Sequence, residues 1–228
     1  MFFNTEKTKT EKRHIPLSAV NMSFPIKFVE ILNFHLPADG KIILDPTCGD
    51  KHSWKHYFNL QEQKGFFKMH QQYEIVFSDI KKMPNQNTND FLDLKFDFLF
   101  DAIFFDPPYI FGGKQNNDPL EKNYGGYDGT YEDLIETIEK ANNKFPLLLK
   151  EKGLLFFKCA DVFSLSDRKY YHNSLWTSLF CNFIIIDCFI IIHHHISGTA
   201  WQVKNRPCSI GNHTYLYVLQ NNYSPKKF

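Results

Sequence analysis

The strongest constraint on the fold is a repeated alternation between short apolar segments and segments with helical periodicity. Apolar runs of strand length recur along the chain, and several are bounded by glycine, proline or aspartate. Between them, apolar residues recur three and four positions apart, as in amphipathic helices. Strands separated by helices favour crossover connections, so we expect a doubly wound, Rossmann-like α/β fold whose mostly parallel sheet has helices on both faces. The predicted strands are residues 41–46, 73–80, 101–108, 153–160, 182–192 and 213–220, and the predicted helices lie near residues 28–36, 54–63, 130–138 and 175–179.

The last two predicted strands, residues 182–192 and 213–220, are not separated by a convincing helix. They are therefore expected to pair antiparallel, as a C-terminal hairpin. The chain shows no internal repeat and no linker of the kind that separates domains. We expect a single domain over residues 15–222, with a flexible polar arm at residues 1–14 and a short tail at residues 223–228.

Composition narrows the class of protein. The 228 residues are 43% hydrophobic and 22% charged, which excludes a disordered chain. The formal net charge is +1, so contacts with nucleic acid would have to come from local patches. The longest apolar run, residues 182–192, contains Asp187 and is too short to span a bilayer. The first residues lack the pattern of a secretory signal, so we expect a cytoplasmic, nucleoid-associated or otherwise intracellular protein with no membrane partner.

Cysteine and histidine do not indicate a metal site. The five cysteines, an odd number, lack the two-residue spacing of a zinc knuckle and are expected to be buried thiols in a reducing compartment. His193, His194 and His195 are adjacent, and neighbours in an extended segment point to opposite faces. We therefore predict no bound metal.

Three consecutive predicted strands end in an aspartate: Asp45, Asp79 and Asp106. In an open parallel sheet, ligands bind beyond the carboxyl ends of the strands. Aspartate also caps helices and opens turns, so each of these residues taken alone could have a structural role instead of a ligand-binding one. The pattern indicates a ligand site at this edge of the sheet.

The most specific motif is Asp106-Pro107-Pro108-Tyr109, which directly follows an apolar strand. Each proline fixes its own φ and forces the residue before it to be extended, so the turn is rigid. Its carbonyls have no helical partner, Asp106 adds a carboxylate acceptor, and Tyr109 adds a flat aromatic face. Two acceptors beside a stacking ring suit a planar molecule that carries an amino group.

The order ILDPTCG, FSDI, DAIFFDPPY and a final strand pair resembles the class I S-adenosylmethionine-dependent methyltransferases. Within them, the DPPY motif is similar to that of the amino-methyltransferases that modify adenine in DNA. The resemblance covers residues 20–220. It implies the class I methyltransferase sheet, S-adenosylmethionine as cofactor, and methyl transfer to an exocyclic amino group, with adenine N6 in DNA as the first candidate acceptor.

The resemblance also implies roles for single residues. Asp45 would close the first strand, and the loop after it would pass under the methionine part of the cofactor; the loop residues are Pro46, Thr47, Cys48 and Gly49, followed by Asp50. Asp79 would accept hydrogen bonds from the ribose hydroxyls. Asp90 and Phe91 would contact the adenine of the cofactor, with Asp93 as an alternative acceptor. Asp106 and Pro107 would bind the acceptor amino group, held by the rigid turn that Pro108 completes, and Tyr109 would stack on the base.

One position departs from the family pattern. The cofactor loop usually carries a second glycine two positions after the first, and here that position is Lys51. The lysine side chain must point away from the cofactor, or the loop must follow another path. A catalytically degenerate binding protein with the same fold is therefore an alternative to an active enzyme.

The remaining expectations concern the acceptor. Residues 110–129 contain five glycines and would form a mobile flap over the base pocket, or a plain surface loop. Basic residues at the same edge would face phosphates: Lys51, Lys55, Lys81, Lys82, Lys114, Lys204 and Arg206. DNA is the expected partner ahead of RNA or a protein amide, and an unrelated binding protein for planar ligands is a further alternative. Because no sizeable recognition domain fits in the chain, we expect a short recognition sequence, or specificity from a homodimer or a partner chain.

Overall fold

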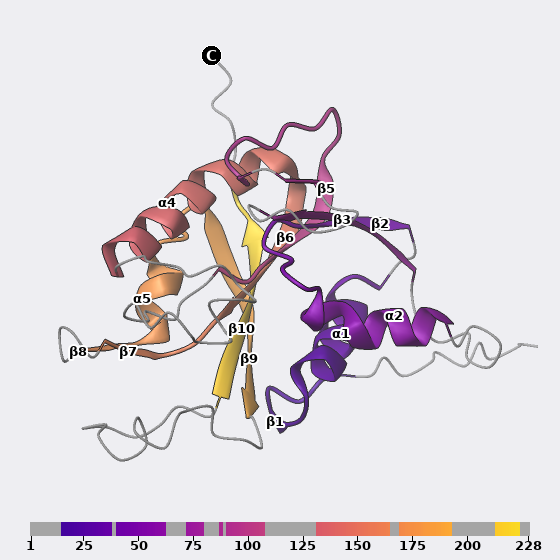
Figure 1. Cartoon of the computed structure of the whole chain (residues 1–228), viewed down its shortest axis with the longest axis horizontal. Helices are drawn as coiled ribbons and strands as arrows, with labels where there is room; N and C mark the ends of the chain where they lie inside the picture. The colour runs from indigo at the N-terminus through magenta and orange to yellow at the C-terminus, as the bar shows by residue number, and fades with distance from the viewer. Residues whose placement is uncertain are drawn as a thin grey trace, which may run out of the picture.

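One mixed sheet forms the centre of the molecule (Figure 1). The computed structural model describes residues 15–37, 40–62, 72–79, 87–88, 90–107, 131–164, 169–192 and 213–223. Within these residues the sheet has eight strands in the order β1-β9-β10-β6-β5-β2-β3-β4. The strands are β1 (Ala19–Asn21), β2 (Lys41–Asp45), β3 (Tyr73–Asp79), β4 (Asn87–Thr88), β5 (Phe100–Phe105), β6 (Leu149–Cys159), β9 (Phe183–Ile192) and β10 (His213–Asn221).

The strand directions confirm the predicted fold class. β2 pairs in parallel with β3 and β5, β5 pairs in parallel with β6, and β3 pairs in parallel with β4. Only β10 runs against its neighbours, pairing antiparallel with β6 and with β9 among the described strands of this sheet. The C-terminal strand pair is therefore antiparallel, as predicted.

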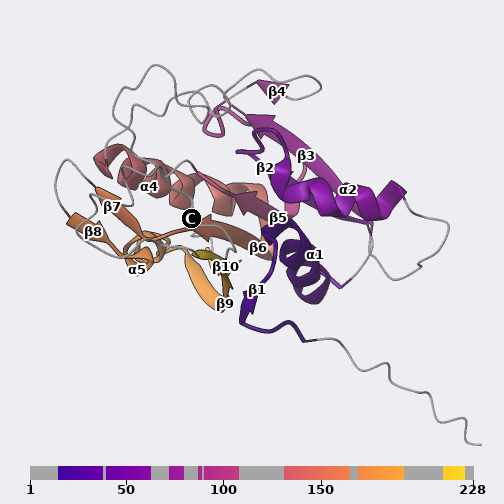
Figure 2. The same cartoon turned by 60° about the horizontal axis from the view of Figure 1, so that its bottom comes forward.

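Helices cover both faces of the sheet (Figures 1 and 2). One face packs against α1 (Phe24–His35), the short 3-10 helix η1 (His52–Trp54) and α2 (Lys55–Glu62), and the other against α4 (Tyr131–Leu148) and α5 (Asn173–Ser178).

The sequence of the central strands explains this two-sided burial. In β5, Phe104 packs toward α1 whereas Phe105 packs toward α4, because successive strand residues point to opposite faces. Phe156 and Phe157 of β6 alternate in the same way, and all four phenylalanines are buried. Burying each such side chain contributes about 1.5–3 kcal/mol, so β5 and β6 anchor both halves of the core.

Several elements differ from the sequence prediction. β6 begins at Leu149 rather than at Gly153, and the short strands β1 and β4 were not predicted. A separate two-stranded ribbon follows β6 and consists of β7 (Val162–Ser164) and β8 (Lys169–Tyr171). These strands have two or three residues, too few for alternation of apolar and polar residues to show in a sequence.

The amino edge of the sheet is fixed by Asp101, near the start of β5. Its carboxylate binds the ammonium groups of Lys41 at 3.0 Å and Lys150 at 2.9 Å, and accepts the N–H of Ile42 at 3.1 Å. Burial raises the pKa of Asp101, but these donors outweigh it, so the pKa lies below its ordinary value. This cluster joins the starts of β2, β5 and β6 at the edge opposite the predicted site.

Some sequence predictions fall outside the described residues: the polar arm, Pro108, Tyr109, the glycine-rich segment 110–129 and the histidines at 193–195. The expectation of buried thiols holds for Cys48 and Cys159 but is wrong for Cys181, which is exposed and accepts a hydrogen bond from Asn142. None of the helices in the described part of the chain has the length and apolar character needed to cross a membrane.

Candidate active site

The carboxyl ends of β2, β3 and β5 meet at one edge of the sheet, because the three strands are parallel neighbours. Asp45 ends β2, Asp79 ends β3, and Asp106 directly follows β5. The three aspartates therefore lie at this edge, and the charges of Asp79 and Asp106 both act on Asp45.

The loop after β2, residues 46–50, links all three strand ends. The N–H of Gly49 donates to Oδ2 of Asp79 at 2.8 Å. The N–H of Thr47 donates to Oδ1 of Asp45 at 3.0 Å, and the Thr47 hydroxyl accepts the N–H of Asp106 at 2.9 Å. One short loop therefore fixes the relative positions of the three carboxylates.

Asp45 is buried, with 1% of its surface exposed, and both of its oxygens are used. Besides Thr47, it accepts a 2.7 Å hydrogen bond from the indole N–H of Trp54. Burial raises the pKa of Asp45 to about 7; the Trp54 and Thr47 donors oppose this shift, while the negative charges of Asp106 and Asp79 add to it. Asp45 therefore supports the loop through these two hydrogen bonds, and its pKa lies near neutral pH.

The unusual Lys51 is accommodated by a left-handed backbone. Its φ of 61° and ψ of 24° lie in a region that glycine adopts more easily. The ammonium lies 4.4 Å from the centre of the Phe77 ring, a cation–π contact with β3. The loop therefore keeps a glycine-like path at this position, and the side chain extends over β3.

The other loop residues are also held in place. Pro46 and Cys48 are buried, and the Cys48 N–H donates to the carbonyl of Ser78 at 3.3 Å. Burial, helped by the charges of Asp45 and Asp79, raises the pKa of the Cys48 thiol to about 12. The thiol therefore stays protonated and is poorly suited to act as a nucleophile.

Asp106 is held at two points. Its N–H binds Thr47, and its Oδ2 lies 2.5 Å from the ammonium of Lys158 on β6. Among the described residues, no hydrogen bond to its Oδ1 is found. Lys158 was not identified from the sequence, because it lies 52 positions from Asp106 and becomes its neighbour only when β5 pairs with β6.

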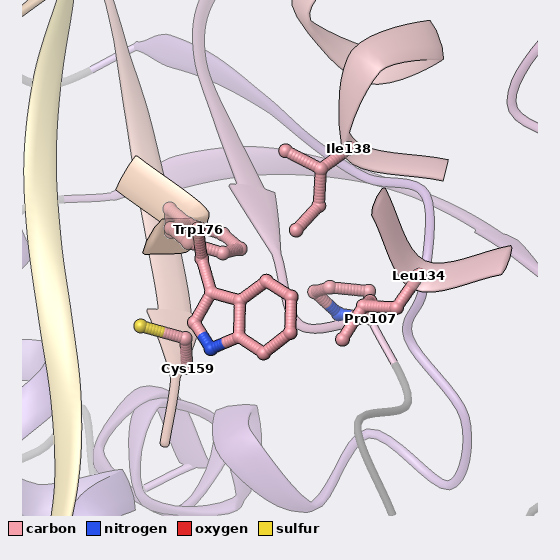
Figure 3. Close-up of a pocket in the computed structure, with 6 residues that line it drawn as sticks. Pro107, Leu134, Ile138, Cys159 and Trp176 are labelled. Carbon is pink, nitrogen blue, oxygen red and sulfur yellow. The ribbon is translucent and has the colours of Figure 1, made fainter. Parts of the chain in front are cut away.

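Pro107 forms one wall of a small apolar cavity between the sheet edge, α4 and α5 (Figure 3). Figure 3 shows the Trp176 indole between Cys159 and Pro107, with Leu134 and Ile138 of α4 beside them. The space between these side chains has no room for a water molecule. Its lining packs against Pro107 and leaves this residue little freedom to shift.

Asp90 and Phe91 lie in the segment before β5. Oδ1 of Asp90 accepts the N–H of Leu92 at 3.0 Å, which closes a local turn. The Phe91 ring packs against Phe105 of β5 and Phe145 of α4, with ring centres 5.7 and 5.4 Å apart. Asp93, the alternative adenine acceptor, is exposed.

A second polar cluster, which the sequence did not reveal, surrounds Asp161 just beyond β6. Its Oδ1 accepts the backbone N–H of Asn173 at 2.7 Å, and its Oδ2 accepts the hydroxyls of Tyr170 at 2.8 Å and Tyr215 at 3.3 Å. Burial raises the pKa of Asp161, but hydrogen bonds from the side chain and backbone N–H of Asn173 and from Tyr170 outweigh it and leave the pKa below its ordinary value. The cluster ties β8 and the start of α5 to β10.

An open hollow of about 440 Å³ lies beside the loop, at the start of α2. It is lined by Asp50, Lys51, His52, Lys55, Phe58 and Asn59. Two of the predicted basic residues, Lys51 and Lys55, therefore line one hollow; the other five lie outside the described residues. In the part of the chain that the structure covers, no group of three metal-ligating side chains comes together.

Comparisons with known proteins give structural matches only. No protein-family model matches the sequence, and no curated protein matches it. Similar solved structures include TrmN from Thermus thermophilus, with 13% identity, a TM-score of 0.48, and coverage of 86% of this chain and 48% of TrmN. The chain thus spans about half the length of TrmN.

Two further structures are matched over most of their length. The N-methyltransferase NodS from Bradyrhizobium japonicum, in complex with S-adenosyl-L-homocysteine, has 11% identity, a TM-score of 0.47, and coverage of 85% of this chain and 84% of NodS. A 16S rRNA (adenine(1408)-N(1))-methyltransferase mutant from Catenulisporales acidiphilia has 11% identity, a TM-score of 0.44, and coverage of 92% and 99%.

These matches have low identity, and the fold assignment stands on the strand order. Viewed from β4 to β9, the sheet runs β4-β3-β2-β5-β6-β10-β9, with β10 alone antiparallel in that series. The chain has a mixed α/β sheet of mostly parallel strands with an antiparallel C-terminal pair.

Proposed function

We propose that this protein is an S-adenosylmethionine-dependent methyltransferase that acts on an exocyclic amino group of a nucleic-acid base, with adenine N6 in DNA as the first candidate. The observation that carries the proposal is the position of the Asp106–Pro107 corner. The corner follows β5 at the carboxyl edge of the sheet, and Thr47 joins it to the loop that also binds Asp45 and Asp79.

The residues of this edge fit the proposed cofactor. Asp45, Asp79 and Asp106 place carboxyl groups around the loop after β2, at the edge where the cofactor is proposed to bind. Gly49 has a φ of 46° and no side chain, so its backbone leaves space for close approach of a ligand. Asp79 ends β3, the position from which acidic residues bind ribose hydroxyls in related dinucleotide folds. Asp90 and Phe91 are proposed to contact the adenine ring.

The proposed reaction is a direct displacement. When bound, the cofactor supplies a methyl group on a positively charged sulfur. The lone pair of the acceptor nitrogen forms the new N–C bond, and the electrons of the breaking S–C bond remain on sulfur as a neutral thioether. Hydrogen bonds from the amino group to Asp106 and to the Pro107 carbonyl strengthen as nitrogen becomes positive, which lowers the barrier. One N–H proton then leaves to solvent.

The acceptor base must reach this corner outside a double helix. An amino group within a duplex is inaccessible, so the base is flipped or already unpaired. Tyr109 is proposed to stack on the base, which contributes about 1–3 kcal/mol. Lys51 and Lys55 are proposed to face phosphates, with a homodimer or a partner chain supplying sequence specificity.

The proposal predicts that the purified chain transfers label from methyl-labelled S-adenosylmethionine to unmethylated DNA. DNA, RNA and a mixed protein fraction are incubated separately and the label in each polymer is counted. Label in DNA at N6 of adenine supports the proposal in full. Label in RNA alone or in protein alone would show that DNA is not the acceptor. Cofactor binding without transfer to any of the three would favour a catalytically inactive binding protein.

The cofactor loop gives a second prediction, for Gly49→Ala. Alanine at a φ of 46° is strained by about 1–2 kcal/mol. We expect the substitution also to weaken binding of S-adenosyl-L-homocysteine by about tenfold or more, because the strained residue changes the path of the loop that is proposed to contact the cofactor.

Gly40→Ala is the matched control. Gly40 has a φ of 71°, and a Cβ added there would meet no atom within 4 Å, so the substitution carries similar strain without touching the loop. Calorimetric titration and urea unfolding of both variants separate the two effects. Equal binding by the two variants would contradict the assigned path of the cofactor.

A further inference from the structure

The pairing of β5 with β6 places Lys158 beside the proposed acceptor site. Phe105 is in register with Phe157, so the next residues along the two strands, Asp106 and Lys158, are neighbours. The Lys158 ammonium lies 2.5 Å from Oδ2 of Asp106 and 4.7 Å from the centre of the Phe24 ring on α1. The side chains of the pair are 17% and 22% exposed, so solvent reaches this interaction only in part.

This contact restricts how the Asp106 carboxylate is oriented. Thr47 holds the backbone N–H of Asp106, and Lys158 holds Oδ2. With both points fixed, rotation of the side chain is restricted and Oδ1 takes a defined direction. A charge-assisted hydrogen bond is shorter and stronger than a neutral one, which makes Lys158 an effective anchor.

We propose that Lys158 is a positioning residue that holds Oδ2 of Asp106, directs Oδ1 to the acceptor, and makes the site selective for a neutral amino group. This inference rests on the proposed methyl transfer, whose bond changes are those given above. The lysine does not touch the reacting atoms and acts through Asp106.

Charge balance supports the selectivity. The ammonium and the carboxylate together carry no net charge, so a cationic acceptor such as a protein lysine gains little attraction to Asp106 and is repelled by Lys158. An alkylammonium also has no lone pair until it loses a proton. The amino group of a nucleobase is neutral and needs only hydrogen-bond acceptors, which Asp106 and Pro107 supply.

The test compares Lys158→Met with Lys150→Met. Both lysines lie on β6, but Lys158 binds Asp106 directly after β5, whereas Lys150 binds Asp101 of β5 at the opposite edge of the sheet. Initial rates are measured with unmethylated duplex and single-stranded DNA, or with RNA if RNA takes the label, and calorimetry gives the affinity for S-adenosyl-L-homocysteine. We expect Lys158→Met to lower kcat by about tenfold or more, with cofactor affinity changed by less than about twofold.

One further variant and one further substrate complete the test. Lys158→Arg, which keeps the charge, should recover a measurable part of kcat. Lys150→Met should keep kcat close to that of the original chain at a temperature where both are folded. A lysine-containing peptide should accept no methyl group.

The outcomes separate this inference from the proposed function. If the original chain is active and Lys158→Met has the same kcat as Lys150→Met, the role of Lys158 is overturned and the proposed function is not. Faster methylation of the peptide than of nucleic acid overturns the selectivity. Absence of transfer from the original chain to any acceptor would overturn both the proposed function and this inference.

Discussion

Replacing Asp106 with alanine is expected to lower methyl transfer by about 10²–10³-fold, the range seen when one group that stabilises transition-state charge is removed. The carboxylate would accept an N–H of the acceptor while nitrogen becomes positive, so its loss acts on kcat more than on substrate binding. The Asp106 N–H still reaches the Thr47 hydroxyl in the variant, because that bond uses only the backbone. Affinity for S-adenosyl-L-homocysteine should therefore change by less than about threefold.

The control for this variant is Asp101→Ala. Asp101 lies on β5, the strand that Asp106 follows, and also forms ion pairs with lysines, but at the amino edge of the sheet. We expect Asp101→Ala to lower stability, because Lys41, Lys150 and the Ile42 N–H lose their shared acceptor, and to leave kcat near its original value. Single-turnover rates at a temperature where both variants are folded make the comparison. Activity in Asp106→Ala equal to that of the original chain would remove Asp106 from the mechanism.

The second large effect is a loss of stability as pH rises, caused by Asp45. Its pKa is about 7 in the folded protein, chiefly because of burial, and about 3.8 in an ordinary environment. Between these values the folded state retains a proton that the unfolded chain releases, so ionisation favours unfolding increasingly as pH rises. The contribution of Asp45 to the free energy of unfolding is fully present below about pH 4, falls as pH rises toward 7, and is lost above pH 7. The total is about 4 kcal/mol, more than half of which falls between about pH 5 and about pH 8.

Asp45→Asn isolates this effect from other titrating groups. Asparagine cannot ionise, and its single oxygen can accept from only one of the two donors, Thr47 or Trp54, so the variant is less stable at low pH. Its free energy of unfolding should nevertheless fall less steeply with pH than that of the original chain. Urea unfolding at a series of pH values measures both slopes. Parallel slopes would show that Asp45 does not carry the proton.

The general architecture could be predicted because the strands of the central sheet have clear boundaries. The runs that became β2, β3 and β5 each lead into an aspartate, and the alternation of β5 places Phe104 and Phe105 on opposite faces. Short elements were missed because they depend on pairing rather than on composition. β1 forms by pairing with residues 190–192 of β9, and its three residues carry no pattern of their own.

The positions of the candidate site residues could be predicted from local sequence patterns. The contacts between residues that are far apart in the sequence could not. Asp45, Asp79 and Asp106 were found because strand ends share an edge of a parallel sheet. The supporting contacts of Thr47 and Lys158 to Asp106 span 59 and 52 positions, so no local pattern indicates them. Trp54 is nine positions from Asp45, yet its hydrogen bond depends on how η1 folds back under the loop. Lys51 stands where the methyltransferases that the sequence resembles usually have a glycine, and the sequence does not show that the backbone there is left-handed.

The central claim is that this edge of the sheet is a methyl-transfer site. A crystal structure of the protein in complex with S-adenosyl-L-homocysteine tests it most directly, through the distance from the ligand sulfur to the Asp106 carboxylate. One methyl group and one acceptor nitrogen must fit between them, which sets this distance at about 6–8 Å. We expect the ligand to lie over residues 46–50, with its ribose at Asp79 and its sulfur within that range of Asp106. A ligand bound elsewhere, or a sulfur far from Asp106, would contradict the assignment of this edge as a methyl-transfer site.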